Sequence, residues 1–185
     1  MVKIYPLLLL KSISGTSSEY ETALRYGEID LIIDYVDLNK SDFISEPLFS
    51  EQLVILARSD HPEIRGALDL ETMLKLRFVH RADRPDDPEP QIDVMLAKLG
   101  RQREISVSVT NWLALPQIVA GSDLICSCGR RFAEAYADNF DLTIHALPFR
   151  VPPVPIHMIW HKNQDEKKAN RWLRAQVKRA CRRMR

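Results

Sequence analysis

The sequence predicts an α/β fold in which helices pack against a parallel sheet. Its first third follows the order strand, helix, strand: an apolar run over residues 7–13, a helical pattern over 19–26, and a β-branched run over 29–33. Short apolar strands on either side of an amphipathic helix are typical of a βαβ unit, whose strands are buried on both faces. Strands and helices also alternate in the rest of the chain, which favours the same fold class.

The later elements follow from the same periodicities. One helix is clearly defined, because Ile92, Met95, Leu96 and Leu99 stand at i, i+3, i+4 and i+7 and Gly100 follows them. The remaining patterns predict strands over 47–57, 77–80, 105–109, 124–128, 142–147 and 156–160, and helices near 69–74, 113–120, 130–137 and 170–185.

Composition and charge limit the function classes. Apolar residues make up 45% of the 185 residues and charged residues 28%, with a formal net charge of +1. These values exclude a disordered, collagen-like or globally nucleic-acid-coating chain. Three cysteines without dense spacing suit a reducing compartment, so we expect a cytoplasmic protein. No stretch of the sequence approaches the ~20 apolar residues of a membrane span, so no membrane partner is expected.

The C-terminal segment differs from the rest of the chain in charge. Residues 161–185 hold ten Lys/Arg and two Asp/Glu, whereas residues 1–160 hold 16 and 23. A basic helix can follow a phosphate backbone. We favour the other interpretation, a helix that caps the fold and exposes a solvated basic face, because bases in a last turn also complement the helix dipole.

Several short strings match one family pattern in order and spacing. They are Gly27-Glu-Ile-Asp-Leu-Ile-Ile33, Pro47-Leu-Phe-Ser-Glu-Gln-Leu-Val54, His61-Pro62, residues 112–121, residues 156–160 and Arg171-Trp-Leu-Arg174. Together, over about residues 4–178, the chain resembles the effector-binding domain of LysR-type transcriptional regulators. The strings between residues 109 and 131, with 147–149 and 160–161, are most similar to the branch of the nodulation regulators and of the salicylate- and nitroaromatic-responsive regulators.

This resemblance implies a two-lobed fold like that of type II periplasmic binding proteins, with a small-molecule cleft between the lobes. We expect residues 1–50 and 156–185 in lobe I and residues 51–155 in lobe II. It also implies a homo-oligomer, a dimer. Full family members read DNA through an N-terminal winged helix-turn-helix. That pattern and the first strand and helix of the effector domain are not found here, so we expect DNA contact through a segment outside this chain and a truncated first lobe.

Two of the candidate binding loops belong to the first lobe. In α/β sheets, ligands gather at the carboxyl ends of strands and at helix N-termini. Ser14 and Thr16 offer hydroxyls at a helix start, where ordinary capping is an equal alternative. Asp34 and Tyr35 follow the second strand, and the tyrosine could stack on a planar ligand or simply plug the hinge.

The other two candidate loops belong to the second lobe. His80 and Arg81 follow a short strand, and a protonatable ring beside a fixed cation would suit an aromatic acid, although a surface-loop role is an equal alternative. Asn111 and Trp112 follow an alternating strand and stand where the resembled branch has effector-contacting residues. They combine an amide that both donates and accepts with a large aromatic wall.

No motif in the sequence indicates catalysis. Cys126 and Cys128 share a strand face but lack the four-ligand spacing of a zinc site, and we interpret both as small buried hydrophobes. The sequence has no glycine-rich phosphate loop and no serine-hydrolase elbow. We therefore expect no enzyme activity, no cofactor and no bound metal.

Three functional hypotheses follow from these patterns. The first is the ligand-sensing and oligomerisation domain of a LysR-type bacterial regulator. Its effector would be a small anion that binds between the lobes, and an aromatic anion is one form of this hypothesis. The second is a stand-alone small-molecule-binding protein of the transport or enzyme kind on the same fold. The third is a truncated regulator that acts through mixed oligomers.

Overall fold

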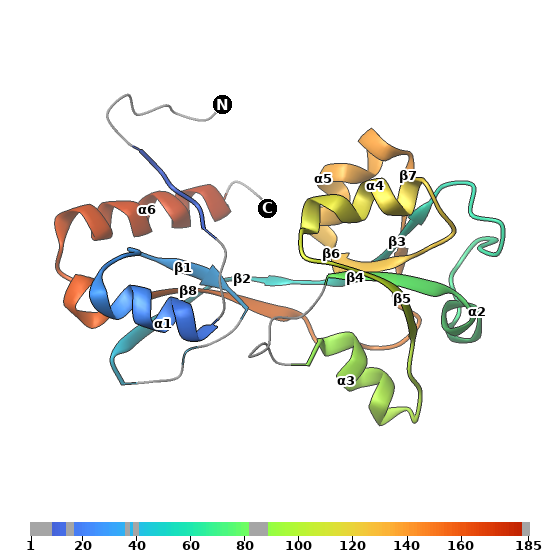
Figure 1. Cartoon of the computed structure of the whole chain (residues 1–185), viewed down its shortest axis with the longest axis horizontal. Coiled ribbons are helices and arrows are strands. Elements are labelled where there is room, and N and C mark those ends of the chain that lie inside the picture. The colour runs from blue at the N-terminus through green and yellow to red at the C-terminus, as the bar shows by residue number, and fades with distance from the viewer. Residues whose placement is uncertain (1–8, 14–16, 36–37, 39–40, 82–88, 183–185) are drawn as a thin grey trace.

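The structure is a computed structural model and describes residues 9–13, 17–35, 38, 41–81 and 89–182. Two groups of helices and strands lie side by side, and the long strands β2 (Phe43–Glu51) and β8 (Val154–His161) run between them (Figure 1). This is the two-part α/β arrangement expected from the sequence. The exact lobe bounds, 50/51 and 155/156, stay a prediction.

The first group is built on an antiparallel sheet in the order β1-β8-β2, which we call sheet A. β1 (Ile32–Asp34) pairs with one side of β8, and β2 pairs with the other. Helix α1 (Ser17–Tyr26) covers one face through Leu24, which packs with Ile32, Phe43 and Ile159. Helix α6 (Lys168–Arg182) lies over the opposite face, where Lys178 pairs with Glu46 of β2 at 2.7 Å (Figure 1).

The second group holds the larger core. Sheet B has the order β6-β3-β7, and sheet C is the parallel pair β4-β5. Backbone hydrogen bonds from Val79 N to Ile125 O, 2.9 Å, and from Ile125 N to Arg77 O, 3.0 Å, join the two sheets. The strands are β3 (Leu53–Arg58), β4 (Arg77–Arg81), β5 (Glu104–Val109), β6 (Cys126–Gly129) and β7 (Leu142–Ala146).

Helices cover both faces of sheet B. The alternation along β3 sends Val54 and Leu56 to one face and Ile55 and Ala57 to the other, and all four are fully buried. A strand buried on both faces is apolar at successive positions, as β3 is from Leu53 to Ala57. The first face is covered by α4 (Leu115–Ala120) and α5 (Arg130–Phe140), and the second by α2 (Leu70–Lys75) and α3 (Gln91–Lys98).

The predictions for the N-terminal third are wrong in two respects. Residues 9–13 belong to no strand, and Leu9 and Leu10 are 92% and 71% exposed, although a buried strand was expected over 7–13. Residues 7 and 8 lie outside the described part of the chain. β1 pairs antiparallel with β8, from the far end of the chain, and not as part of a parallel βαβ unit.

The single strand predicted over residues 47–57 is two strands in different sheets. β2 ends at Glu51 and β3 begins at Leu53, so Gln52 stands between them. Its carbonyl oxygen accepts a hydrogen bond from Arg130 N, 2.8 Å away, at the start of α5. At the point where the chain changes sheets, this backbone group thus pairs with a helix start.

The predicted helices are confirmed, with ends shifted by a few residues. Asp69 caps α2, because its carboxylate accepts a hydrogen bond from Thr72 N at 2.7 Å. The same bond, with a second one from the Thr72 hydroxyl, holds the pKa of Asp69 below its usual value. None of the helices in the described residues is long and apolar enough to span a membrane.

We expect His145 of β7 to make the fold less stable in mild acid. Burial, and to a lesser extent the neighbouring His61, lower the pKa of His145. The unfolded chain then binds a proton at the ordinary value, about 6.5, while the folded chain binds it only at a lower pH. The contribution of His145 to stability is thus full above that value and falls as the pH drops through it.

Replacing His145 with glutamine should therefore reduce the fall in melting temperature between about pH 7.5 and about pH 5.5, a range that brackets the ordinary histidine value. Thermal unfolding of both proteins at the two pH values measures the change. An equal fall in the two proteins would contradict this role.

Candidate functional site

The carboxyl ends of β4 and β5 bring two of the predicted residues together. Arg81 ends β4 opposite Val109, the last residue of β5, and the chain continues from there to Trp112. The guanidinium carbon of Arg81 lies 5.4 Å from the centroid of the Trp112 ring. A guanidinium at this distance over an indole is held by a cation–π interaction. A fixed cation and an aromatic face therefore lie at the same edge of sheet C.

Aromatic side chains extend this edge towards α5. The centroids of Trp112 and Phe132 are 5.8 Å apart, and those of Phe132 and Tyr136 are 4.9 Å apart. Trp112 is still 42% exposed, although it contacts both Arg81 and Phe132. Its ring thus keeps surface on which a planar molecule can stack.

Asn111 has a clear local role. Its side-chain oxygen accepts a hydrogen bond from Leu113 N at 2.9 Å and caps the 3-10 turn Trp112–Ala114. The cap uses the carbonyl oxygen. A ligand would therefore meet the amide hydrogens of Asn111, which are donors.

His80 takes part in a network that the sequence did not predict. Arg103, just before β5, donates from Nε and Nη2 to the carboxylate of Asp93 at 2.7 and 2.6 Å. Its Nη2 also lies 3.4 Å from His80 Nδ1, and its Nη1 donates to Ser127 Oγ at 3.5 Å. This buried arginine thus connects the start of α3 with β4 and β6.

Two more of the predicted residues, Asp34 and Tyr35, belong to the first group of elements. Asp34 ends β1 opposite His157 of β8, and its Oδ1 accepts a hydrogen bond from Tyr35 N at 2.7 Å. On the other side of β8, the Oγ of Ser45 in β2 lies 3.0 Å from His157 Nδ1. Ser14 and Thr16 lie outside the described residues.

A second group of residues, also not predicted, lies where β2 meets α5. Arg131 donates to the Glu51 carboxylate at 3.2 Å and to the carbonyl oxygen of Ser50 at 3.2 Å. Its guanidinium carbon lies 4.6 Å from the centroid of the Phe49 ring. An ion pair and a cation–π contact thus fasten β2, which runs between the two groups of elements, to the second group.

The cysteines of β6 behave as the sequence predicted. Cys126 and Cys128 are both buried, in the core under α4 and α5. A hydrogen bond with Cys128, together with burial, raises the pKa of Cys126 well above its ordinary value. Within the part of the chain that the structure describes, no group of three or more His, Cys, Asp or Glu side chains is placed to hold a metal ion.

Two surface depressions lie away from the predicted site residues. One, of about 350 Å³, is lined by the loop before α2 and by Asp69 and Thr72. The other, of about 430 Å³, lies between Arg58, Asp60 and the loop after α4. Neither is lined by a predicted site residue. Their walls are formed by one group of elements alone, so they differ from the cleft expected between lobes.

The fold is that of bacterial regulatory domains. The regulatory domain of MexT, a transcriptional activator in Pseudomonas aeruginosa, superposes with a TM-score of 0.73 at 25% identity, over 85% of this chain and 77% of that one. The effector-binding domain of QuiR, solved in complex with shikimate, superposes with a TM-score of 0.72 at 18% identity, over 91% of this chain and 79% of that one. The two-lobed, periplasmic-binding-protein-like fold is thereby confirmed.

The sequence comparison identifies the family. The model of the LysR substrate binding domain matches residues 3–182, so the chain belongs to this family. The curated relatives that it matches are named as transcriptional activators and regulators, not as enzymes. The transcriptional activator NahR from Pseudomonas putida is 27% identical over 169 residues, 91% of this chain and 56% of NahR. Nodulation protein D from Azorhizobium caulinodans is 27% identical over 174 residues, 92% of this chain and 54% of that protein. The chain spans about half the length of these relatives.

Proposed function

We propose that the chain is the ligand-sensing and oligomerisation domain of a LysR-type regulator in the bacterial cytoplasm. In this proposal a small anionic effector binds between lobe I (residues 1–50 and 156–185) and lobe II (residues 51–155). DNA is contacted through another segment of the regulator. The observation that supports the proposal most is the contact of Arg81 with Trp112 at the carboxyl edge of sheet C.

The chemistry of this pair favours an aromatic acid. A guanidinium binds a carboxylate through charge-assisted, often bidentate, hydrogen bonds. An exposed indole face offers a stacking surface for a planar ring. Asn111, whose oxygen is used by the helical cap, contributes donor hydrogens beside them. All three side chains therefore suit a ligand that combines a flat ring with negative oxygen atoms.

The proposed mechanism is a shift of populations. The effector binds one relative arrangement of the lobes more tightly and so increases its share. β2 and β8 run between the two groups of elements, and the register of β2 against β8 shifts between Pro47 and Phe49. A register irregularity in a connecting strand is a natural place for a bend. The altered lobe arrangement then changes the geometry of the oligomer.

A thermal-shift experiment tests the proposal. A ligand at about 100 times its dissociation constant stabilises the folded state by about 2.7 kcal/mol. We expect benzoate or salicylate to raise the melting temperature of the wild-type chain, and uncharged benzamide to have a much smaller effect. In Arg81→Gln the effect of the acids should be lost, and in Asn111→Asp it should decrease, since the new carboxylate keeps the cap acceptor but repels an anion.

Arg101→Gln is the matched control. Arg101 is an exposed arginine in the loop between α3 and β5 and pairs with Glu71. This variant should respond to the acids as the wild type does. Stabilisation by neither acid, or equal stabilisation of the wild type and Arg81→Gln, would overturn the proposed site.

A further inference from the structure

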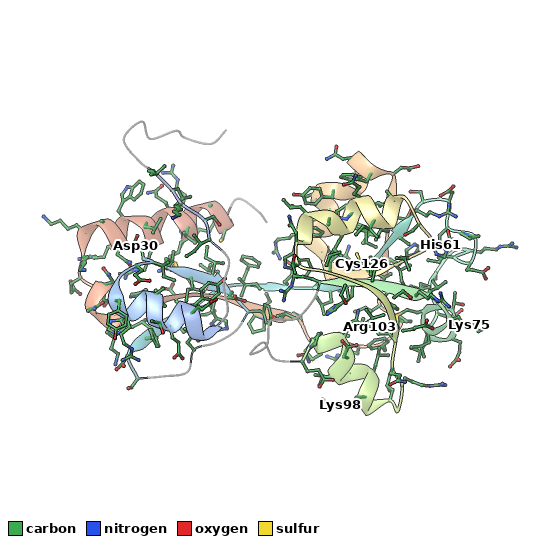
Figure 2. The ribbon with its side chains drawn as sticks, viewed as in Figure 1. Asp30, His61, Lys75, Lys98, Arg103 and Cys126 are labelled. Atoms are coloured by element: carbon green, nitrogen blue, oxygen red, sulfur yellow. The ribbon has the colours of Figure 1, made fainter. Side chains whose placement is uncertain are left out.

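One side of helix α6 fastens it to the first group of elements. Asn170, 2% exposed, donates from Nδ2 to the carbonyl oxygen of Asp30 at 2.7 Å. Asp30 lies on the side of α6 that faces sheet A (Figure 2). Arg174 pairs with Asp165 at 3.0 Å, and Lys178 pairs with a carboxylate of β2. The bases Arg174 and Lys178 are therefore neutralised by carboxylates of the chain itself.

The other side of α6 carries exposed bases, which we call the basic face. Its members are Lys168, Arg171, Arg179 and Arg182, and all four are exposed. With 3.6 residues per turn and 1.5 Å of rise per residue, they fall within an arc of about 80° and along about 21 Å of the helix. The helix contains no Asp or Glu. The basic face is thus a narrow stripe of charge of a single sign.

The charges of the basic face are not neutralised within the chain. Arg171 lies 3.7 Å from Glu166, but the two side chains are 63% and 89% exposed, so solvent screens this pair. Lys168, Arg179 and Arg182 have no acidic side chain within ion-pair distance among the residues that the structure describes. These cations remain available to an anionic partner, in contrast to those on the side that faces the sheet.

We propose that the basic face of α6 lies against the phosphate backbone of DNA, beside the segment of the regulator that reads the sequence. This inference rests on the part of the proposed function in which another segment holds the DNA. A DNA duplex carries one negative charge per about 1.7 Å of its axis, so phosphates can meet the stripe along its whole length. An acidic protein surface seldom offers such a continuous line of charge, because charges of both signs are mixed on most protein surfaces.

The contact adds affinity and no sequence preference, because phosphates carry no sequence information. It is weak by itself. In a regulator that is already held on its DNA it becomes intramolecular, and a high effective concentration then compensates for the weakness.

The salt dependence of binding tests the number of phosphate contacts. Fluorescence anisotropy of a short labelled duplex measures binding by the unmodified chain. Four contacts predict a slope of about −3.6 in log K against log salt, or a fall of about 150-fold in affinity between about 50 and 200 mM salt. Two duplexes of unrelated sequence should bind equally.

A double variant, Arg171→Gln with Arg179→Gln, removes two of the contacts. The slope should fall to about −1.8, which is a loss of only about 12-fold over the same range of salt. The matched control, Arg77→Gln with Arg101→Gln, changes the net charge equally but at exposed arginines of the second group, which pair with Glu104 and Glu71. The control should keep the wild-type slope.

Three outcomes would overturn the inference. They are no binding of duplex DNA at about 50 mM salt, equal slopes in the two double variants, and tighter binding of polyglutamate than of DNA, which would favour an acidic protein as the partner. The thermal shift with benzoate is measured without DNA, so the two proposals can fail separately. Stabilisation by benzoate without DNA binding leaves the proposed effector site standing, and DNA binding without stabilisation by benzoate or salicylate leaves the basic face standing.

Discussion

Replacing Asp93 with asparagine should lower the free energy of unfolding by about 3 kcal/mol, the lower end of the range for breaking a buried ion pair. The Arg103 side chain is 2% exposed and stays charged, so the change removes the counter-charge that the described residues place against this buried cation. The lower end applies because the Asp93 side chain is 23% exposed and water can enter. Urea unfolding curves measure the loss.

The exposed pair of Arg101 and Glu71 provides the control. Its N–O distance is 2.9 Å, but the two side chains are 49% and 66% exposed. Glu71→Gln should cost less than about 1 kcal/mol, because solvent screens exposed pairs. Equal losses in Asp93→Asn and Glu71→Gln would contradict the claim that burial makes the difference.

Replacing Phe78 with alanine should cost about 4 kcal/mol. Phe78 is fully buried in the core between sheet C, α2 and α3, and truncation of a buried phenylalanine leaves a cavity. The change also removes the ring against which Arg103 packs. The loss is expected as a lower urea midpoint with an unchanged slope.

Ile105 is the matched control for Phe78. It faces Phe78 in the register of β4 and β5 but is 43% exposed. Ile105→Ala should cost about 1 kcal/mol, since much of the side chain already contacts water. A loss as large as that of Phe78→Ala would mean that strand pairing, and not burial, sets the stability of this region.

The helices of the second group could be predicted because their signals are local. Ile92 and Leu96 of α3 stand at helical spacing, and both are buried against sheet C. Gly100 follows with a positive φ of 67°, a conformation that glycine adopts without strain. The periodicity and the stop lie within ten residues, so no distant contact was needed.

The sheet of the first group could not be predicted because its strands pair with partners that are distant in sequence. An apolar run such as residues 7–13 shows that burial would be favourable but not what would cover it. The strand beside β1 is β8, more than 110 residues later, and nothing local specifies that pairing. The antiparallel sheet was missed for this reason.

The candidate site likewise contains residues that the sequence could predict and residues that it could not. Arg81 and Trp112 could each be selected because each follows a strand, and the parallel register of β4 and β5 brings them together. Arg103 precedes a strand, and its side chain extends along the sheet to His80. Its place in the sequence therefore did not mark it as a candidate. The contact of Glu51 with Arg131 joins residues 80 positions apart, and no local pattern predicted it either.

The place of β8 between β1 and β2 has a consequence for biosynthesis. Every strand of sheets B and C lies between residues 53 and 146, so these sheets can assemble as soon as that part leaves the ribosome. β1 and β2 emerge earlier but pair with each other only through β8, which is translated afterwards. Among the strands that the structure describes, β1 and β2 therefore lack their shared partner β8 until the middle of the chain has been made.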